Sequence, residues 1–582
     1  MAGATGFEPA ISALTGPHVE PLHHAPKRYI CYHIVEYKSS NFSNSFIIMI
    51  NANDGRMIMK IVSVEQMRTI EKEADARGLS YRTMMENAGR RIADWVLQNL
   101  DVQKGVIGLI GSGNNGGDTI IALTWLAKWG IRTFAFLAKQ REGDILLDEY
   151  RLHGGTVVDI SKNENLDIFK AALTKNVIVL DGFLGTGFKL PLKGGLYNVM
   201  RNIHKLLKNR LDLLTIAVDC PSGVDCDTGE TSESTLSAEH TLSLAAIKKG
   251  LLAHPARSFA GKLHLIDIGT GDPTVYIHED LPVMIGTSLI ESIFPERPDN
   301  GHKGTFGTCL VIAGSSSFVG AAYLTGKAAY RAGCGLVHMG VVRDVYNALA
   351  GKLIESVWTI LPDIDGRFDP EHFSNLGSAL ENANAVVIGP GWGVCEINTI
   401  FLEKFLRSYS YSAPLLIDAD ALKLLINFDK WWTLLPDHVV LTPHPGEMSV
   451  LTGLTTSEIQ ANRWQIAREY ADLWQVNLVL KGAMTVVAIP NHQTYINPVS
   501  EPALATAGSG DVLSGVIGGL TAQGLSPEHA SILGVWLHSN AGEIAKAHYK
   551  TDMSVTALDV LYFLPDAIVK AKEAGKNTSL NT

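Results

Sequence analysis

Polar side chains that could bind a ligand stand in the turn GSGNNGGDT, which spans residues 111–119. Apolar runs precede and follow the turn, so the sequence predicts a strand, a glycine turn and a helix. Gly111, Gly113 and Gly116 fit the G-x-G-x-x-G pattern of turns that hold a dinucleotide phosphate at a helix N-terminus. Asp118 is expected in the first turn of that helix, where the helix dipole favours a carboxylate. Alone, the pattern also fits an ordinary capped turn.

The turn lacks the acidic partner that a redox cofactor requires. Dinucleotide-binding folds carry an acidic residue roughly 20 positions after the glycines, where it binds the ribose hydroxyls. Here the second predicted strand is followed by Lys139 and Gln140, and no acid stands at that point. The sequence therefore disfavours an NAD-dependent dehydrogenase.

Two more polar loops follow predicted strands of the first half. Asp181 begins the loop DGFLGTGFKLP, and Asp219 begins the loop DCPSGVDCDTG. Ligands of open α/β folds bind at the sheet edge where the strands end, so the three loops together predict a binding site. Asn115, Asp181 and Ser222 can supply amide, carboxylate and hydroxyl oxygens, which suit a hard cation.

Together with MENAG at residues 85–89, these loops resemble the NAD(P)H-hydrate epimerase domain over about residues 57–272. The resemblance implies that hydrated nicotinamide dinucleotides, NADHX and NADPHX, are the substrates. It also implies a potassium ion (K+) bound by Asn115, Asp181 and Ser222. The substrate-binding residues that it implies are Asn114, Asn115, Gly116, Gly117, Asp118, Gly185, Thr186, Gly187, Phe188, Lys189, Leu190, Pro191 and Asp219.

Epimerisation must invert the hydroxyl-bearing carbon of the hydrate, through ring opening or through transient loss and return of water. A carboxylate placed at that carbon would move the proton. Asp219 and Asp181 are both candidates for this catalytic role. The sequence does not separate them, although a potassium ligand is the poorer free base. For Asp219 alone, a cap on the following turn is the alternative interpretation.

The strongest phosphate-binding pattern is ATAGSGDVLSG at residues 505–515. Its glycines clear side chains from the turn, and the backbone amides that open the next helix can hold a transferring phosphoryl group. Asp511 is placed to accept a proton from the attacking hydroxyl. Lys481 can reach a nucleotide phosphate, and Glu447 is a candidate for the magnesium shell, through water. His444, between two prolines, is alternatively an ordinary loop histidine.

Five further segments accompany this pattern, namely HKGTFG, GPGWG, DADAL, TPHPGEM and VLKGAMTVV. Together they resemble the ADP/ATP-dependent NAD(P)H-hydrate dehydratase domain, which has a ribokinase-like fold, over about residues 281–564. The resemblance implies that ADP or ATP, with Mg2+, phosphorylates the hydroxyl of the S hydrate, and that elimination then regenerates NAD(P)H. It implies Ala321, Gly391, His444 and Asp511 at the hydrate, and Lys481, Gly482, Ala483, Met484, Thr485 and Gly510 at the adenine nucleotide.

Predicted strands and helices alternate along both halves of the 582-residue chain, which indicates α/β domains with mostly parallel sheets. We expect a Rossmann-like three-layer αβα domain over residues 57–276 and a ribokinase-like αβα domain over residues 281–577. A helix over residues 554–574 is expected to break or kink at Pro565. The predicted strands are 106–110, 133–137, 177–180, 214–218, 263–268, 308–312, 335–339, 385–388, 415–417, 439–441, 476–480 and 485–489.

Residues 1–56 form an irregular extension in which Pro, Gly and His are scattered without periodicity. One interpretation is a mis-called start, with Met57 or Met59 as the real first residue. The other is a disordered or partner-binding extension, and the sequence does not decide between them.

Composition excludes several classes of function. A net charge of −10 argues against a general nucleic-acid or membrane-surface binder. Six cysteines without a C-x-x-C pair are typical of reduced thiols in the cytoplasm, and no apolar run reaches membrane-spanning length. We expect a cytoplasmic homo-oligomer. The sequence does not distinguish ADP from ATP, or NADH hydrate from NADPH hydrate.

The two resemblances complement each other, because one activity supplies the substrate of the other. The chain is therefore predicted to be a bifunctional isomerase and lyase that repairs hydrated NADH and NADPH. One alternative is a ribokinase-like small-molecule kinase of the hydroxymethylpyrimidine type with a nucleotide-binding accessory domain, against which the three cation-site residues argue. Another is that the first half only senses nucleotides or acts as a scaffold.

Overall fold

The computed structural model describes residues 58–161, 165–174, 177–277 and 280–579. The extension expected at residues 1–56 lies outside the described residues. Strands and helices alternate along the chain. The strands form a seven-stranded sheet, a twelve-stranded sheet and a two-stranded hairpin of β14 (Asp363–Ile364) and β15 (Arg367–Phe368). The predicted α/β class is therefore confirmed.

The seven-stranded sheet belongs to the first half, and all its neighbouring strands are parallel. In spatial order the strands are β4 (Thr156–Asp159), β3 (Thr133–Leu137), β2 (Val106–Ile110), β5 (Ile178–Gly182), β6 (Leu214–Val218), β7 (His240–Leu244) and β9 (Lys262–Ile266). The five strands predicted in this half are present. The sequence did not reveal β4 and β7, because both mix polar with apolar residues. Since β2, β5 and β6 are neighbours, the three polar loops leave the same edge.

Helices cover both faces of this sheet. The helices are α1 (Val64–Ala76), α2 (Tyr81–Asn99), α3 (Asn114–Lys128), α4 (Ile145–Leu152), α5 (Leu166–Ala172) and α6 (Gly194–Leu207). Val106 and Ile110 of β2 share one apolar cluster with α1 to α4, whereas Ile107 and Leu109 share another with α5 and α6. Alternate residues of a strand point to opposite faces, so β2 is apolar throughout. The result is the predicted three-layer αβα arrangement.

Local side-chain bonds fix where the first two helices begin. Ser63 accepts a hydrogen bond from the Gln66 backbone amide (3.1 Å), and the Gln66 side chain accepts one from the Ser63 amide (2.8 Å). This reciprocal pair is a capping box, which satisfies amides that the first helical turn leaves free. Ser80 caps α2 without a reciprocal bond, because its hydroxyl accepts a hydrogen bond from the Thr83 amide at 3.1 Å.

The twelve-stranded sheet contains most strands of the second half together with β1 and β8 of the first half. In spatial order they are β13 (Val357–Leu361), β12 (Leu336–Val342), β11 (Thr308–Ile312), β16 (Ala385–Ile388), β17 (Leu415–Ile417), β18 (Val439–Leu441), β19 (Asn477–Leu480), β20 (Val486–Ala488), β21 (Thr494–Ile496), β10 (Val283–Met284), β1 (Met59–Val62) and β8 (Ile247–Lys248). The strands from β13 to β19 are parallel, and β20 and β21 pair antiparallel. All predicted strands of this half are present, and β10, β13, β14, β15 and β21 are additional.

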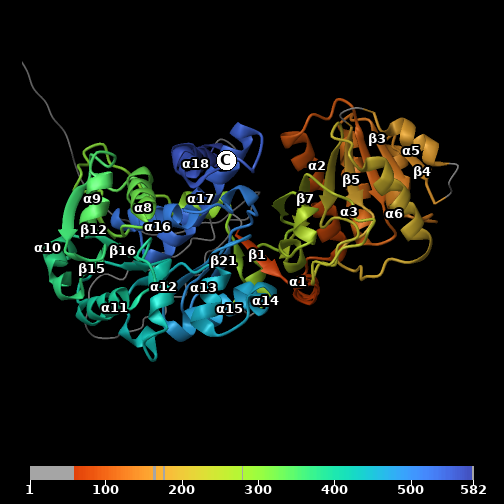
Figure 1. Cartoon of the computed structure of the whole chain (residues 1–582). Helices are drawn as coiled ribbons and strands as arrows, with labels where there is room; N and C mark the ends of the chain where they lie inside the picture. Colours follow the sequence, from red (N-terminus) through yellow and green to blue (C-terminus); the bar gives the residue numbers. More distant parts are fainter. Residues whose placement is uncertain (1–57, 162–164, 175–176, 278–279, 580–582) are drawn as a thin grey trace, which may run out of the picture. The chain divides into compact units, whose positions relative to one another are not determined.

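Helices flank this sheet on both sides, as Figure 1 shows for α8, α16, α17 and α18 on one side and α11 to α15 on the other. The helices are α7 (Thr287–Ile293), α8 (Val319–Ala332), α9 (Arg343–Leu349), α10 (Gly377–Glu381), α11 (Glu396–Ser408), α12 (Asp420–Leu425), α13 (Pro445–Thr452), α14 (Thr456–Ala461), α15 (Arg463–Trp474), α16 (Ser509–Ala522), α17 (Pro527–Tyr549) and α18 (Ala557–Ser579). The break expected at Pro565 is absent, because α18 continues through it. Leu561 and Leu564 before the proline and Ala567 after it are all buried in the core, which holds the helix together.

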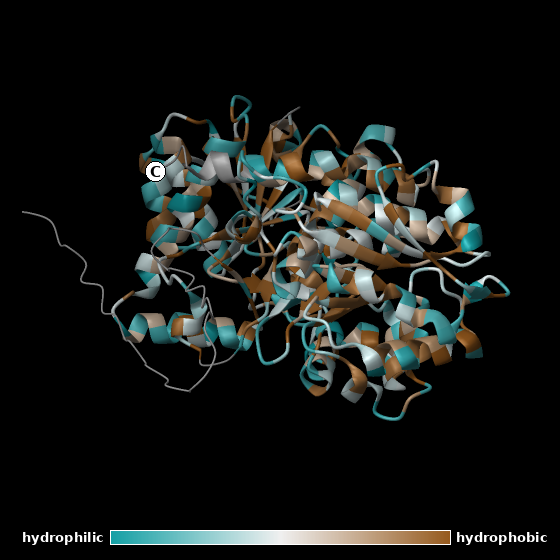
Figure 2. Ribbon diagram, turned by 90° about the vertical axis from the view of Figure 1, so that its left-hand side faces the viewer, coloured by the Kyte–Doolittle hydropathy of each residue, from teal (hydrophilic) through white to brown (hydrophobic). Residues whose placement is uncertain are grey.

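Apolar residues concentrate in the sheets. In Figure 2 the strands are mostly brown, whereas the surrounding helices alternate between brown and teal, as amphipathic helices do. Within the described ranges, no helix is both long and apolar enough to cross a membrane.

Two candidate active sites

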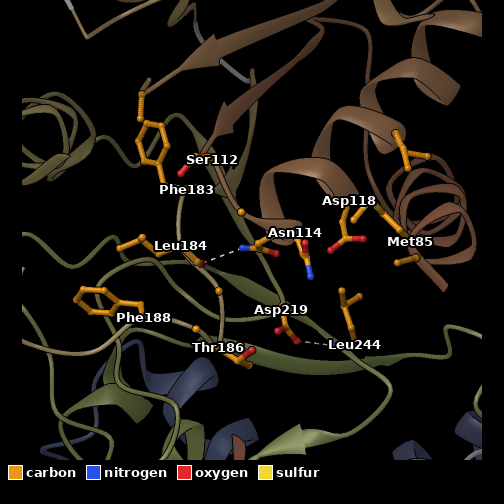
Figure 3. Close-up of a pocket in the computed structure, with 18 of the residues that line it drawn as sticks. Met85, Ser112, Asn114, Asp118, Phe183, Leu184, Thr186, Phe188, Asp219 and Leu244 are labelled. Atoms are coloured by element: carbon orange, nitrogen blue, oxygen red, sulfur yellow. Dashed lines mark hydrogen bonds between the residues drawn. The ribbon is translucent and has the colours of Figure 1, made fainter. Parts of the chain in front are cut away.

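A pocket of about 1310 Å³ opens at the edge of the seven-stranded sheet where β2, β5 and β6 end. The loops after these strands supply much of its lining, and α1 and α2 contribute Glu71, Met84 and Met85. Figure 3 shows the side chains of Asp118 and Asp219 pointing toward the same space from α3 and from the end of β6. Polar and apolar walls together suit a ligand with both a ring and charged groups.

The glycine turn after β2 needs glycine because two chain segments meet there. A Cβ atom on Gly111 would lie 1.9 Å from the carbonyl oxygen of Phe183, and one on Gly116 would lie 2.3 Å from the carbonyl oxygen of Gly111. Since α3 begins at Asn114, Asp118 is its fifth residue, and the first turn holds no acid. The expectation that Asp118 lies in the first turn is therefore wrong, and its carboxyl instead faces the pocket one turn further along.

The three residues predicted to hold a cation lie close together, because Asn115 and Ser222 both bond to Leu184 and Ser222 bonds to Asp181. The Ser222 hydroxyl donates to Asp181 Oδ1 at 2.6 Å, and the Ser222 amide donates to Asp181 Oδ2 at 2.8 Å. Asn115 donates from its amide nitrogen to the Leu184 carbonyl at 2.8 Å, while Asn115 Oδ1 is buried without a hydrogen-bond partner. Burial raises the pKa of Asp181 to about 6.

This donor set fits a potassium ion. Amide, carboxylate and hydroxyl oxygens are hard ligands, and an unpartnered buried oxygen such as Asn115 Oδ1 requires a partner. Asp181 and Ser222 are fully buried. Neither lines the pocket, so the carboxylate of Asp181 is directed to Ser222 and not to a substrate.

Asp219 has a different environment, because it lines the pocket and pairs with a buried lysine. Its backbone is in the left-handed region, with φ at 65°. Asp219 Oδ1 accepts hydrogen bonds from Lys248 Nζ and, at 3.0 Å, from the Leu244 amide. Lys248 Nζ also donates to the Leu244 carbonyl at 2.7 Å, and its side chain is 1% exposed. The sequence did not reveal Lys248, because no recognisable motif surrounds it and it lies 29 residues from its partner.

The remaining residues predicted for the first site divide into two groups. Asn114, Asn115, Asp118, Gly185, Thr186, Gly187, Phe188, Lys189 and Asp219 line the pocket, whereas Gly116, Gly117, Leu190 and Pro191 do not. A Cβ atom on Gly117 would lie 2.8 Å from Met85 Sδ, so Gly117 allows α3 to pack closely on α2.

The second site is built around the start of α16. Gly508 is the helix N-cap with φ at 86°, and Asp511 lies in the first turn, as predicted. Burial, reinforced by the negative charge of Asp418, raises the pKa of Asp511 to about 7. A carboxyl group with a pKa near neutrality can accept and release a proton at physiological pH.

A buried ion pair lies beside this helix start. Lys481 Nζ lies 2.7 Å from Asp418 Oδ1 and 3.7 Å from Glu447 Oε2, and the Ser514 hydroxyl donates to Asp418 Oδ2 at 2.6 Å. A Cβ atom on Gly510 would lie 3.2 Å from Lys481 Nζ, so the pair adjoins the glycine turn. Burial alone would raise the pKa of Asp418, but the Lys481 charge and the hydrogen bonds lower it below its usual range. Asp418, at the start of DADAL, was not predicted as a site residue.

His444 and Glu447 form the capping box of α13. His444 Nδ1 accepts hydrogen bonds from the amides of Gly446 (3.0 Å) and Glu447 (3.3 Å), and Glu447 Oε2 accepts one from the His444 amide (2.9 Å). Burial and the nearby charges of Lys481 and Lys423 lower the pKa of His444, which agrees with a neutral ring that accepts at Nδ1.

The structure also places the other residues predicted for the second site. Gly391 has φ at 68°, and a Cβ atom there would lie 2.7 Å from that of Ala321, so these two predicted hydrate contacts adjoin each other. In the predicted nucleotide segment, Gly482 has φ at 135° and accepts a hydrogen bond from the Thr485 hydroxyl at 2.9 Å. Met484 is buried in an apolar cluster, while Ala483 is exposed.

Both halves match known protein families. The family model described as NAD(P)H-hydrate dehydratase matches residues 309–564, and the model described as YjeF-related protein N-terminus matches residues 82–250. The first of these ranges contains most of the second site, and the other contains most of the first site.

Several curated proteins are similar along most of the chain. The bifunctional NAD(P)H-hydrate repair enzyme Nnr of Moorella thermoacetica is 34% identical over 530 residues, covering 88% of this chain and 98% of the relative. The corresponding Escherichia coli enzyme is 31% identical, covering 84% of this chain and 90% of the relative. The ADP/ATP-dependent NAD(P)H-hydrate dehydratase from Bacillus subtilis, co-crystallised with ATP and Mg2+, is 30% identical. It covers 50% of this chain and 98% of that one, with a TM-score of 0.43.

Proposed function

Because this chain belongs to the family of bifunctional NAD(P)H-hydrate repair enzymes, we propose that it restores hydrated NADH and NADPH in two steps. The first half interconverts the R and S hydrates, and the second half dehydrates the S hydrate at the expense of a nucleotide. The similarity over 88% of the chain carries this proposal, since it spans both candidate sites. We divide the chain accordingly into an epimerase domain at residues 57–276 and a dehydratase domain at residues 281–577.

In the epimerase domain, Asp219 is the better candidate for the base. It lines the pocket, whereas Asp181 is fully buried and accepts hydrogen bonds from Ser222. Lys248 holds one oxygen of the Asp219 carboxylate, which leaves the other oxygen available to the substrate. Asn114, Asn115, Asp118 and the residues at 185–189 surround the remainder of the hydrate, and the helix N-terminus at Asn114 suits its phosphates.

Asn115, Asp181 and Ser222 would hold the potassium ion of this domain. The unpartnered oxygen of Asn115 supports this assignment. When bound, the ion supplies a fixed positive charge at the floor of the pocket. The Asp181–Ser222 hydrogen bonds join the end of β5 to the loop after β6.

In the dehydratase domain, Asp511 accepts the proton of the hydrate hydroxyl while that hydroxyl attacks a phosphoryl group. The amides at the start of α16 are oriented to stabilise the transferred group, because helix N-termini bind anions. Lys481 contributes positive charge next to Gly510. ADP or ATP with Mg2+ supplies the phosphoryl group, and Glu447 is the side chain that we assign to the magnesium shell. His444 and Asp511 would contact the hydrate.

The expected cellular setting follows from the chemistry. The cysteines within the described ranges, Cys220, Cys226, Cys309, Cys334 and Cys395, are free, which supports a reducing compartment such as the cytoplasm. A homo-oligomer stays a prediction, which light scattering of the purified protein tests.

Separate assays test the two activities. The purified protein and a single hydrate epimer, without nucleotide, should give a mixture of R and S hydrates. The S hydrate with Mg2+ and nucleotide should give NADH or NADPH, and parallel reactions with ADP and ATP identify the donor. If no hydrate reacts in either assay, repair is excluded and a small-molecule kinase becomes the leading function.

A further inference from the structure

Asp118 has the environment of an acid and not of a structural carboxylate. It is 7% exposed and lines the epimerase pocket. No hydrogen bond or ion pair within the described part of the chain uses its carboxyl group. Buried polar groups are almost always paired, so an unpartnered carboxyl that faces a binding pocket suggests that its partner is the ligand.

The charges around Asp118 come from three other elements. Glu71 of α1 and Asp219 after β6 are negative, and Lys248 of β8 is positive. Lys248 donates a hydrogen bond to Asp219, so the positive charge of Lys248 is paired with Asp219 and not with Asp118. Other charged side chains line the wider pocket, namely Arg68, Arg82, Glu86, Lys139 and Lys189.

This setting favours the neutral form of Asp118. Burial, reinforced by the negative charges of Asp219 and Glu71, raises the pKa of the Asp118 carboxyl well above its usual range. Asp219, in contrast, accepts a hydrogen bond from Lys248 Nζ. Two carboxyl groups therefore face one pocket, from α3 and from the end of β6 (Figure 3), and only Asp219 is bonded to a lysine.

We propose that Asp118 is a second catalytic residue of the epimerase, which donates a proton to the hydrate hydroxyl while Asp219 receives one from water. The inference rests on the proposed epimerase function and assigns how the proton moves. It also selects loss and return of water over ring opening, because a proton donor at the hydroxyl oxygen promotes its departure.

The step balances as follows. The Asp118 proton moves to the hydroxyl oxygen, the carbon–oxygen bond breaks, and water leaves while the ring nitrogen forms a double bond to that carbon. A second water molecule adds to the opposite face and loses a proton to Asp219. One proton has moved from Asp118 to Asp219, proton exchange with solvent returns both carboxyl groups to their starting states, and nothing is oxidised or reduced. In the reverse direction the two carboxyl groups exchange roles, which accounts for interconversion of both epimers.

The central test is Asp118→Asn, which keeps the shape of the side chain but removes the acid. The kcat for epimerisation should fall by about 10²- to 10⁴-fold, while KM changes much less. Dehydratase activity of the same molecule reports on the second half of the chain and should stay normal. Asp75→Asn, an exposed change on α1 outside the pocket, is the matched control and should behave as wild type.

Two measurements on the wild type keep the proposal testable even if Asp118→Asn misfolds. Each inversion in ¹⁸O-labelled water should introduce one solvent oxygen, and kcat should fall as rising pH deprotonates Asp118. Inversion without incorporation of solvent oxygen would overturn the proposal, and so would an unchanged kcat in Asp118→Asn. A raised KM with an unchanged kcat would indicate that Asp118 only binds the substrate. If the wild type does not epimerise at all, the proposed function itself fails, which is a distinct result.

Discussion

Lys481 Nζ lies 2.7 Å from Asp418 Oδ1, and this buried contact joins the end of β19 to the end of β17. The Ser514 hydroxyl binds the other oxygen of the same carboxylate, so α16 is tied to the pair as well. Three elements that carry the dehydratase site are thus held by one carboxylate, and the charge on Lys481 is balanced before any nucleotide binds.

Removing Asp418 should therefore destabilise the dehydratase domain. Asp418→Asn leaves the buried Lys481 ammonium without its carboxylate, and we expect a loss of about 3–5 kcal/mol in the free energy of unfolding. Urea denaturation, with dehydratase activity as the probe of unfolding, measures this loss. Glu371→Gln, which breaks the exposed pair with Lys404, is the control and should cost less than about 1 kcal/mol. Equal stability of the two variants would contradict the assigned role.

The pH dependence of dehydration should follow Asp511. The pKa of this carboxyl is raised to about 7, and it must be ionised to accept a proton. The kcat/KM for the S hydrate should therefore fall as pH drops below about 7 and level off above it. Asp511→Asn should lower kcat by about 10²- to 10⁴-fold and leave epimerisation intact. A dehydration rate that stays constant between about pH 5 and pH 8 would argue against Asp511 as the base.

Epimerisation should depend on potassium. The oxygen of Asn115 lacks a partner, and Asp181 and Ser222 are buried beside the pocket floor. Replacing K+ by tetramethylammonium at constant ionic strength should slow epimerisation, and Asn115→Leu should abolish the difference between the two salts. Dehydration by the same samples controls for general salt effects if it is assayed with saturating S hydrate. An equal epimerisation rate in both salts would contradict the assignment of Asn115, Asp181 and Ser222 as potassium ligands.

The glycine turn after β2 should tolerate a methyl group at one position and not at another. Gly111→Ala would place Cβ 1.9 Å from the Phe183 carbonyl oxygen, so the loop after β5 must move. We expect a loss of about 1–3 kcal/mol in stability and a large loss of epimerase activity. Gly113→Ala meets no atom within 4 Å and should fold normally. Thermal unfolding of both variants checks this, and similar melting temperatures would show that the close approach is not needed.

The sequence predicted the glycine turns, the α/β class and most strands, because each depends on local patterns of apolar residues and glycine. It did not predict Lys248 or the role of Asp418, since both act through partners far away in the chain. β7 was missed because polar residues interrupt HTLSL. Pro565 was expected to break or kink the last helix, and α18 is not broken there, because residues on both sides of the proline pack in the core. Contacts formed only by the folded chain account for these differences.

The most direct test of two-step repair uses mixed R and S NADH hydrate with Mg2+, K+ and nucleotide. The wild type should return the reduced-nicotinamide absorbance of both epimers. The Asp219→Asn variant should restore only the absorbance of the S hydrate at enzymatic speed. Adding the Asp511→Asn variant, which retains epimerase activity, should then restore the absorbance of the R hydrate. If Asp219→Asn recovers both epimers as fast as the wild type, the first half is not an epimerase that uses Asp219, and the account fails at its central claim.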